Sequence, residues 1–190
     1  MRYIGAISDT DILINFAKVK RLDILGCLFE KIIIPQYIYD IELKRKAGKC
    51  YSYITQIVCD VDSIFQVMDR KTDLALNLLS KEIIEEKKKL IGPGESECAG
   101  YAAALRIPII ISDNHTEFKW LDEFITLTHQ DILCLCVHFG EIAEMDGDNL
   151  FNMINNQLSR PTQRTFQDFY KKSMREFKDK GWDTYLRLGL

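Results

Sequence analysis

Short runs rich in β-branched residues alternate with longer amphipathic stretches along most of this chain. The runs lie at residues 3–8, 31–35, 106–112 and 124–128, and isoleucine recurs in all four. Nearly continuous apolar runs of this length are typical of strands buried on both faces of a sheet. Because such runs alternate with helical stretches, the sequence predicts an α/β fold. We expect a three-layer α/β/α arrangement with a mostly parallel central sheet.

Capping and breaking residues indicate where the helices begin and end. Asp9 or Thr10 can cap the first helix, Pro35 suits the first turn of another, and Gly92-Pro93-Gly94 forms a firm break. Helices are expected at residues 11–20, 21–29, 36–46, 73–90, 95–105, 131–139, 148–158 and 161–178, with Asp73 and Asp131 as caps. The stretch 50–70 has helical spacing at its start and a strand-like end, so its structure stays open.

The composition is that of a globular protein and excludes several other classes. With 190 residues, 47% of them hydrophobic, the chain can bury a sizeable core. Acidic residues interrupt the N-terminus early, and no apolar run approaches the roughly 18 residues of a membrane helix. We therefore expect a soluble cytoplasmic protein without membrane contact, whose six cysteines are reduced. Residues 1–130 are expected to form the main domain, and residues 131–190 a helical C-terminal extension packed on it.

Acidic side chains follow two of the predicted strands at the point where each strand ends. Asp9 comes directly after residues 3–8, and Asp113 directly after residues 106–112. Because the carboxyl ends of parallel strands meet at one edge of a sheet, we expect these carboxylates to lie close together. Glu95 opens the helix that leads into the second of these strands, so its side chain can reach the same edge.

An acidic group of this kind favours a metal site. Three carboxylates within about 5 Å repel one another by roughly 3 kcal/mol per pair at an effective dielectric constant near 20. Such a group needs protons, basic partners or a cation, and oxygen-only ligands suit Mg²⁺ or Mn²⁺. The alternative is that Asp9 and Glu95 only cap helices and that Asp113 only begins a turn.

The residues around these acids match a known pattern. Residues 7–15 form a strand end, an Asp, a Thr and an apolar helix, and residues 32–42 form a strand, a Pro and an acid-bearing helix. Residues 92–105 combine Gly-Pro-Gly-Glu-Ser-Glu with a helix of small residues, and a strand ending in Asp follows at residues 109–113. Over about residues 1–130 the chain resembles the PIN-domain family, and within it a VapC-type toxin-like subgroup.

The resemblance implies a Mg²⁺- or Mn²⁺-dependent endoribonuclease that hydrolyses RNA, often as the toxin of a toxin–antitoxin pair. Carried over by position, Asp9, Glu95 and Asp113 are the metal-binding and catalytic acids. A protein antitoxin is the implied partner, and a homodimer is a further expectation. The family has another acid three residues after an apolar residue, and counting from Ile38 gives Ile41. Asp40 flanks this position and is preferred as the fourth catalytic residue.

Further site candidates surround these acids. Glu42 flanks Ile41 on its other side, Thr10 can bond to a carboxylate or a bound water, and Glu97 follows Glu95 by two residues on a different helix face. The basic residues that could draw a nucleic-acid backbone toward the pocket are Lys44, Arg45 and Lys46.

The main alternative function is a catalytically weak PIN fold that serves as a nucleic-acid or protein-binding module. The irregular fourth acid and the formal net charge of −3 favour it. A small-molecule-binding α/β domain lacks support because no phosphate-binding glycine loop is present. Cys134, Cys136 and His138 spread over different faces of one helix, which excludes a zinc site formed by these three.

Overall fold

A five-stranded parallel sheet forms the centre of the computed structural model, which describes residues 3–189. The strands are β1 (Ala6–Ser8), β2 (Ile32–Pro35), β3 (Phe65–Met68), β4 (Ile109–Ile111) and β5 (Ile125–Leu127). Their order is β3-β2-β1-β4-β5, and every neighbouring pair is parallel. Ile7 of β1 pairs with Ile33 on one side and Ile110 on the other. The predicted α/β fold with a parallel central sheet is confirmed.

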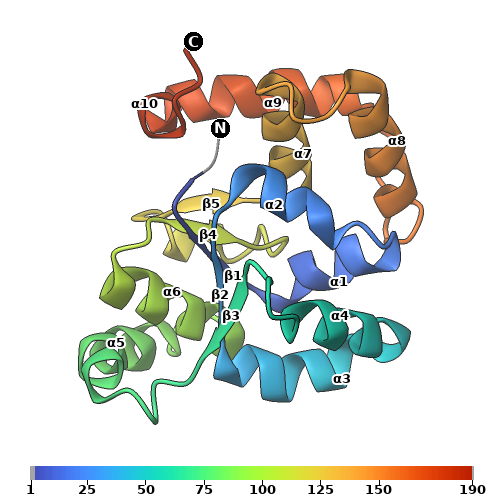
Figure 1. Cartoon of the computed structure of the whole chain (residues 1–190). Helices are drawn as coiled ribbons and strands as arrows, with labels where there is room; N and C mark the ends of the chain where they lie inside the picture. Colours follow the sequence, from blue (N-terminus) through green and yellow to red (C-terminus); the bar gives the residue numbers. More distant parts are fainter. Residues whose placement is uncertain (1–2, 190) are drawn as a thin grey trace.

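Helices cover the sheet on both sides (Figure 1). The longer ones are α1 (Thr10–Lys18), α4 (Tyr51–Val58), α5 (Leu74–Lys87), α6 (Pro93–Leu105), α7 (His129–His138), α8 (Glu144–Asn155) and α9 (Phe166–Asp179). The short ones are η1 (Leu22–Ile24), α2 (Leu25–Leu28), η2 (Ile38–Leu43), α3 (Lys44–Lys46), η3 (Gly48–Cys50), η4 (Phe118–Trp120) and α10 (Trp182–Leu186). Helix α6 packs on β1, β2 and β4 and is covered by α5, away from α7–α10. Helix α7 packs against β5, α1 and α2 and carries α8 and α9.

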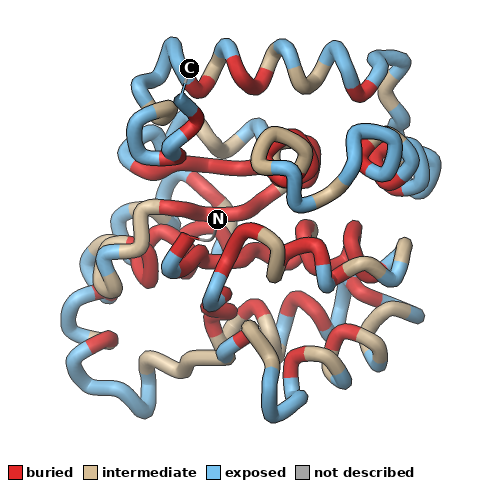
Figure 2. The backbone as a smooth tube through the Cα atoms, turned by 45° about the horizontal axis from the view of Figure 1, so that its top comes forward, coloured by how far each residue is buried: buried red, intermediate tan, exposed pale blue. Residues whose placement is uncertain are grey.

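The path of the chain creates a topological switch point between β1 and β4. From β1 the chain adds β2 and β3 on one side, and it then returns through α5 and α6 to add β4 and β5 on the other. Crevices that bind ligands in open α/β sheets form at such a point, beyond the carboxyl ends of the strands. Buried residues concentrate in the centre of the molecule, and exposed residues lie at its periphery (Figure 2).

The structure corrects several expected boundaries. Thr128, not Asp131, caps α7, because the Thr128 side chain bonds to the Asp131 amide while the Asp131 carboxylate bonds back to Thr128, forming a capping box. Helix α8 begins at Glu144 rather than near residue 148, and α9 begins at Phe166 after a second capping box. The open stretch 50–70 contains both a helix and a strand, and α10 was not expected.

None of the six cysteines, all within residues 3–189, forms a disulfide. Cys98, Cys134 and Cys136 are buried, whereas Cys59 is exposed. Across residues 3–189, no helix combines the length and apolar character that crossing a membrane requires.

Close contact between α5 and α6 yields a test of the packing. A Cβ atom at Gly100 of α6 would lie 2.8 Å from Ile84 Cδ1 and 3.1 Å from the Ser80 carbonyl oxygen of α5. Gly100→Ala should therefore lower the free energy of unfolding by about 1–3 kcal/mol, as overpacked cores do. Gly26→Ala is the matched control, because its new Cβ would lie 3.7 Å from the nearest atom. Equal urea-unfolding midpoints for Gly100→Ala and the wild type would contradict the packing.

Candidate active site

Asp9 lies at the switch point, between the ends of β1 and β4. Its amide donates a hydrogen bond to the Ile111 carbonyl oxygen at 2.9 Å, which continues the β1–β4 pairing. Its carboxylate caps α1 by accepting from the Thr10 amide at 2.7 Å, and its other oxygen accepts from the Ser112 hydroxyl at 3.0 Å. The side chain is 2% exposed. Asp9 is therefore held rigidly at the base of the crevice.

Burial and neighbouring acids make ionisation of Asp9 unfavourable. Burial, followed by the charges of Glu95, Asp11 and Glu42, raises the pKa of Asp9 to about 8 against the opposing hydrogen bond from Thr10. Glu95 lies in the first turn of α6, and burial is also the main cause that raises its pKa. The Asn114 amide opposes this shift by donating to Glu95 Oε1 at 2.7 Å. The charge of Glu95 is thus one of the causes that disfavour the ionised form of Asp9.

Glu42 is the acid of η2 that reaches this pair. It is 4% exposed, accepts a hydrogen bond from the Thr10 hydroxyl at 3.1 Å, and pairs with Lys46 at 2.5 Å. A Cβ atom at Gly94 would lie 2.6 Å from Glu42 Oε1, so the glycine allows Glu42 to lie against the start of α6. Glu42 of η2 therefore lies against both α1 and the start of α6.

The winding of η2 explains why Glu42 and not Asp40 faces the pair. Residues Ile38–Leu43 form a π-helix, whose turns contain more residues than those of an α-helix. The added residue brings Glu42 to the position that α-helical counting assigned to Ile41. The Ile41 side chain is instead 50% exposed. Asp40 instead bonds to Gln36 and to Lys44, the latter at 3.3 Å, and the Gln36 bond is the main cause that lowers its pKa. Glu42, and not Asp40, is therefore the acid of η2 that contacts Thr10 and lies against the start of α6.

Glu97 also lies outside this group. Arg70 binds both of its carboxylate oxygens, at 3.0 and 3.2 Å, on the side of α6 that faces Lys88. This placement agrees with the expectation that Glu95 and Glu97 occupy different faces of one helix.

Asp113 is stabilised in its charged form by groups that were not expected at the site. Its Oδ1 lies 2.9 Å from both the backbone nitrogen and the Nδ1 atom of His129, and its Oδ2 accepts from Asn15 at 2.6 Å. Burial raises the pKa of Asp113, but the charge of His129 and the hydrogen bonds of His129 and Asn15 outweigh it, so the pKa is lowered. His129 follows β5, so the strand-end rule that singled out the acids could have found it.

A cleft of about 540 Å³ opens beside Asp113. Asp11, Asn15, Lys18 and Lys46 line it, and residues 157–159 between α8 and α9 form another part of its wall. Of the three expected basic contacts, Lys46 therefore reaches the cleft, while Lys44 pairs with Asp40 and Arg45 is exposed. Two lysines on its wall suit the approach of a phosphate backbone.

The carboxylates suit a hard divalent cation in donor type but are not gathered around one point. Within residues 3–189, no three His, Cys, Asp or Glu side chains are placed to hold one ion together. Lys46 lies on Glu42, and Asp113 is occupied by His129 and Asn15. Burial and the charge of Glu95 disfavour the ionised form of Asp9, which a cation would stabilise.

The raised pKa of Asp9 predicts a pH-dependent stability. Between the ordinary value of 3.8 and about 8, the folded state binds more protons than the unfolded state, so wild-type stability falls as the pH rises through this range. Asp9→Asn should therefore be more stable than the wild type at pH 8, by roughly 2–4 kcal/mol in EDTA, with the difference vanishing near pH 4. Urea unfolding at several pH values measures this.

Asp40→Asn is the matched control for this experiment. Because the pKa of Asp40 is lowered, its carboxylate stays charged in both states above pH 5, and the difference from the wild type should not change between pH 5 and pH 8. An Asp9→Asn difference that is equally constant over this range would contradict the buried acidic pair.

Comparison with known proteins assigns the fold to a family. A family model described as a PIN domain matches residues 5–121, more than half of the chain. The curated proteins contain no match. Six chains of solved structures match, among them the crystal structure of VapBC2 from Rickettsia felis bound to a DNA fragment from their promoter. It is 16% identical with a TM-score of 0.46, and the match covers 66% of this chain and 98% of that chain. By its match to the family model, this chain belongs to the PIN-domain family.

Proposed function

We propose that this protein is a divalent-metal-dependent endoribonuclease. The observation that carries the proposal is the buried Asp9 beside the switch point, where burial and the charges of Glu95, Asp11 and Glu42 raise its pKa to about 8. A protein gains no stability from such an arrangement, and perturbed carboxylates in a crevice are typical of functional sites. RNA as the substrate rests on the resemblance to the family.

The donor set fits Mg²⁺ or Mn²⁺. Asp9 and Glu95 would hold the ion, with Glu42 and Asp113 as the remaining acids of the site, because hard cations prefer oxygen ligands. When bound, such an ion polarises a phosphate oxygen and lowers the pKa of water. Binding would also relieve the repulsion among the carboxylates, which costs stability in its absence.

The side chains of this protein have complementary tasks in the proposed reaction. Ser112 and Thr10 orient Asp9, and Asn114 orients Glu95. Asn15 and His129 keep Asp113 charged at the wall of the cleft, where it can orient a water molecule for attack on phosphorus.

The phosphodiester backbone would be bound by the lysines of the same cleft. Lys18 and Lys46 line it together with Asp113. Their charges can offset the repulsion between a phosphate and the acids during its approach.

One observation favours a second function, a binding module with little catalytic activity. Lys46 already neutralises Glu42, so part of the acidic group is balanced without a cation. Under this alternative, nucleic acid or a protein would bind at the cleft and would not be cleaved.

We further propose a protein antitoxin as partner and a homodimer as the assembly, both from the family resemblance alone. A second gene translated immediately upstream would support the antitoxin. Light scattering of the purified chain measures the assembly.

A cleavage assay with matched variants tests the nuclease. Labelled RNA, single-stranded DNA and double-stranded DNA are incubated with the protein in Mn²⁺ or EDTA. We expect metal-dependent RNA cleavage that falls by about 10²–10⁴-fold in Asp9→Asn, Asp113→Asn and Glu42→Gln, the range for a positioned acid or base. Asp40→Asn should cleave as the wild type does, because Asp40 lies outside the acidic group.

Two outcomes would overturn parts of this proposal. RNA binding without cleavage in the wild type would leave the binding module as the function. Loss of activity in Asp40→Asn with full activity in Glu42→Gln would show that the acid of η2 is wrongly assigned.

A further inference from the structure

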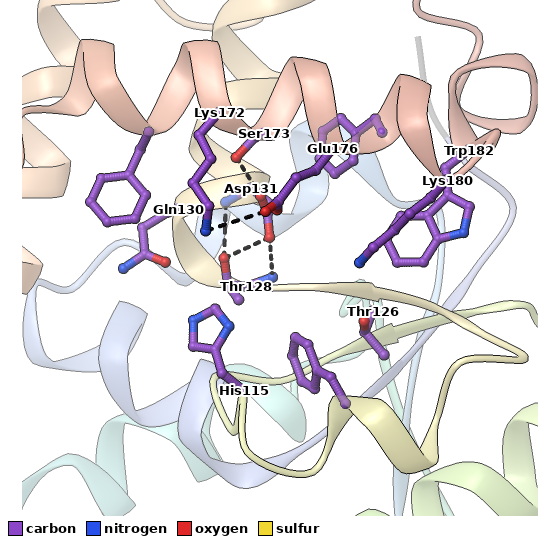
Figure 3. A pocket seen from close by; sticks show the side chains of 13 residues that line it. His115, Thr126, Thr128, Gln130, Asp131, Lys172, Ser173, Glu176, Lys180 and Trp182 are labelled. Carbon is purple, nitrogen blue, oxygen red and sulfur yellow. Dashed lines mark hydrogen bonds and ion pairs between the residues drawn. The ribbon is translucent and has the colours of Figure 1, made fainter.

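A small cavity lies beside the acidic site, between the start of α7 and helices α9 and α10 (Figure 3). Its volume is about 190 Å³. Ser173 and Glu176 enter from α9, and His115 comes from the loop after β4 (Figure 3). A second hollow adjoins it and shares four of its residues, namely Phe118, Thr126, Lys180 and Trp182.

Two buried polar side chains in the wall have unmet hydrogen-bonding capacity. Gln130 is 8% exposed and Thr126 is 5% exposed, yet neither side chain makes a hydrogen bond to any residue in the described range 3–189. Their neighbours Thr128, Asp131 and Ser173 are bonded to one another. The polar atoms of Gln130 and Thr126 are not among the fully buried side-chain atoms without a partner, which in residues 3–189 are Ser80 Oγ and His129 Nε2, so they open onto the cavity and are free to bond to a ligand with donors and acceptors of its own.

The charges of the wall are largely balanced, which argues against a simple anion site. Lys172 pairs with Glu176 at 3.4 Å, and Asp131 bonds to Ser173 at 2.6 Å. Lys180 lies over the Trp182 ring, 4.2 Å from its centroid. The wall therefore presents amide, hydroxyl and aromatic groups in preference to free charge.

A nucleobase fits these properties. It is flat, stacks on aromatic rings and presents donors and acceptors at its edge, which is how proteins read unpaired RNA bases. The cavity of about 190 Å³ is smaller than the pockets of drug-sized ligands, which measure about 300–1,000 Å³, so it suits a single ring system. Phe118 and Trp182 offer rings for stacking, and Gln130 offers both a donor and an acceptor for the base edge.

Two chain connections place this cavity next to the acidic site. Thr128 and Gln130 line it on either side of His129 in the sequence, and His129 binds Asp113. His115 also lines it and follows Asp113 by two residues, a span of at most about 7 Å. A base held here would belong to a nucleotide close to the phosphodiester at Asp113.

We propose that this cavity is a base-recognition subsite for the RNA strand that the acidic site cleaves, which rests on the proposed nuclease function. Gln130 and Thr126 read the edge of the base, and Phe118 and Trp182 contact its face. Residues 172–182 of the wall lie beyond the part matched by the family model, so the C-terminal helices supply much of this specificity.

Fluorescence of Trp182 tests the subsite without any cleavage. The full chain, as Trp120→Phe so that Trp182 is its only tryptophan, is titrated with each of the four ribonucleoside 5′-monophosphates in EDTA. We expect saturable quenching that is strongest for one base. Gln130→Ala and the isosteric Thr126→Val should each weaken this binding at least tenfold, whereas Gln66→Ala, on the exposed side of β3, should not change it.

The possible results distinguish a failure of the subsite proposal from a failure of the nuclease proposal. Absence of saturable quenching by all four nucleotides, or equal quenching in both wall variants, would overturn the subsite even if RNA is cleaved. Base-selective quenching in a protein that cleaves nothing would overturn only the nuclease. Thermal unfolding verifies that each variant is folded. If Gln130→Ala does not fold, the binding measured with Thr126→Val alone decides whether the subsite exists. With an active enzyme, cleavage positions in mixed-sequence RNA should follow the same base and lose that preference in Thr126→Val.

Discussion

The adjacency of β1 and β4 is the constraint on which the rest of the site depends. Asp9 and Ser112 are 103 residues apart, yet the Ser112 hydroxyl donates to Asp9 while the Asp9 amide continues the strand pairing to Ile111. Because all five strands are parallel, this contact lies at the carboxyl edge of the sheet. Glu95 and Asp113 approach Asp9 only because β4 and α6 are positioned by this pairing.

Local backbone geometry positions an acidic group whose buried charges destabilise the folded protein. The π-helical turn of η2 directs Glu42 inward, and Gly94 leaves room for its carboxylate at the start of α6. Lys46 and the Thr10 hydroxyl partly offset the buried charge of Glu42. Asp9 has no basic partner among residues 3–189 at hydrogen-bond distance, and burial is the main cause that raises its pKa. In the proposed function, substrate and cation would bind at this acidic surface.

The C-terminal helices contribute directly to the surfaces around Asp113. Residues 157–159 form part of the cleft that contains Lys18 and Lys46, and α9 and α10 form much of the neighbouring cavity. Helix α7 links the two, since His129 at its start binds Asp113 and the flanking residues line the cavity. We therefore propose that the C-terminal helices, which were expected to pack on the main domain, also shape the surface that binds substrate.

The sequence by itself determined four of the five strands and most helices, and it singled out three acids as site candidates, because these depend on local patterns. Isoleucine-rich runs, the break at residues 92–94 and the position of Asp9 and Asp113 after strands are all readable along the chain. Only the tertiary structure decided between Asp40 and Glu42, since one π-helical turn changes which residue faces inward. The same holds for the cavity at Gln130, whose neighbours come from distant segments that only the folded chain brings together.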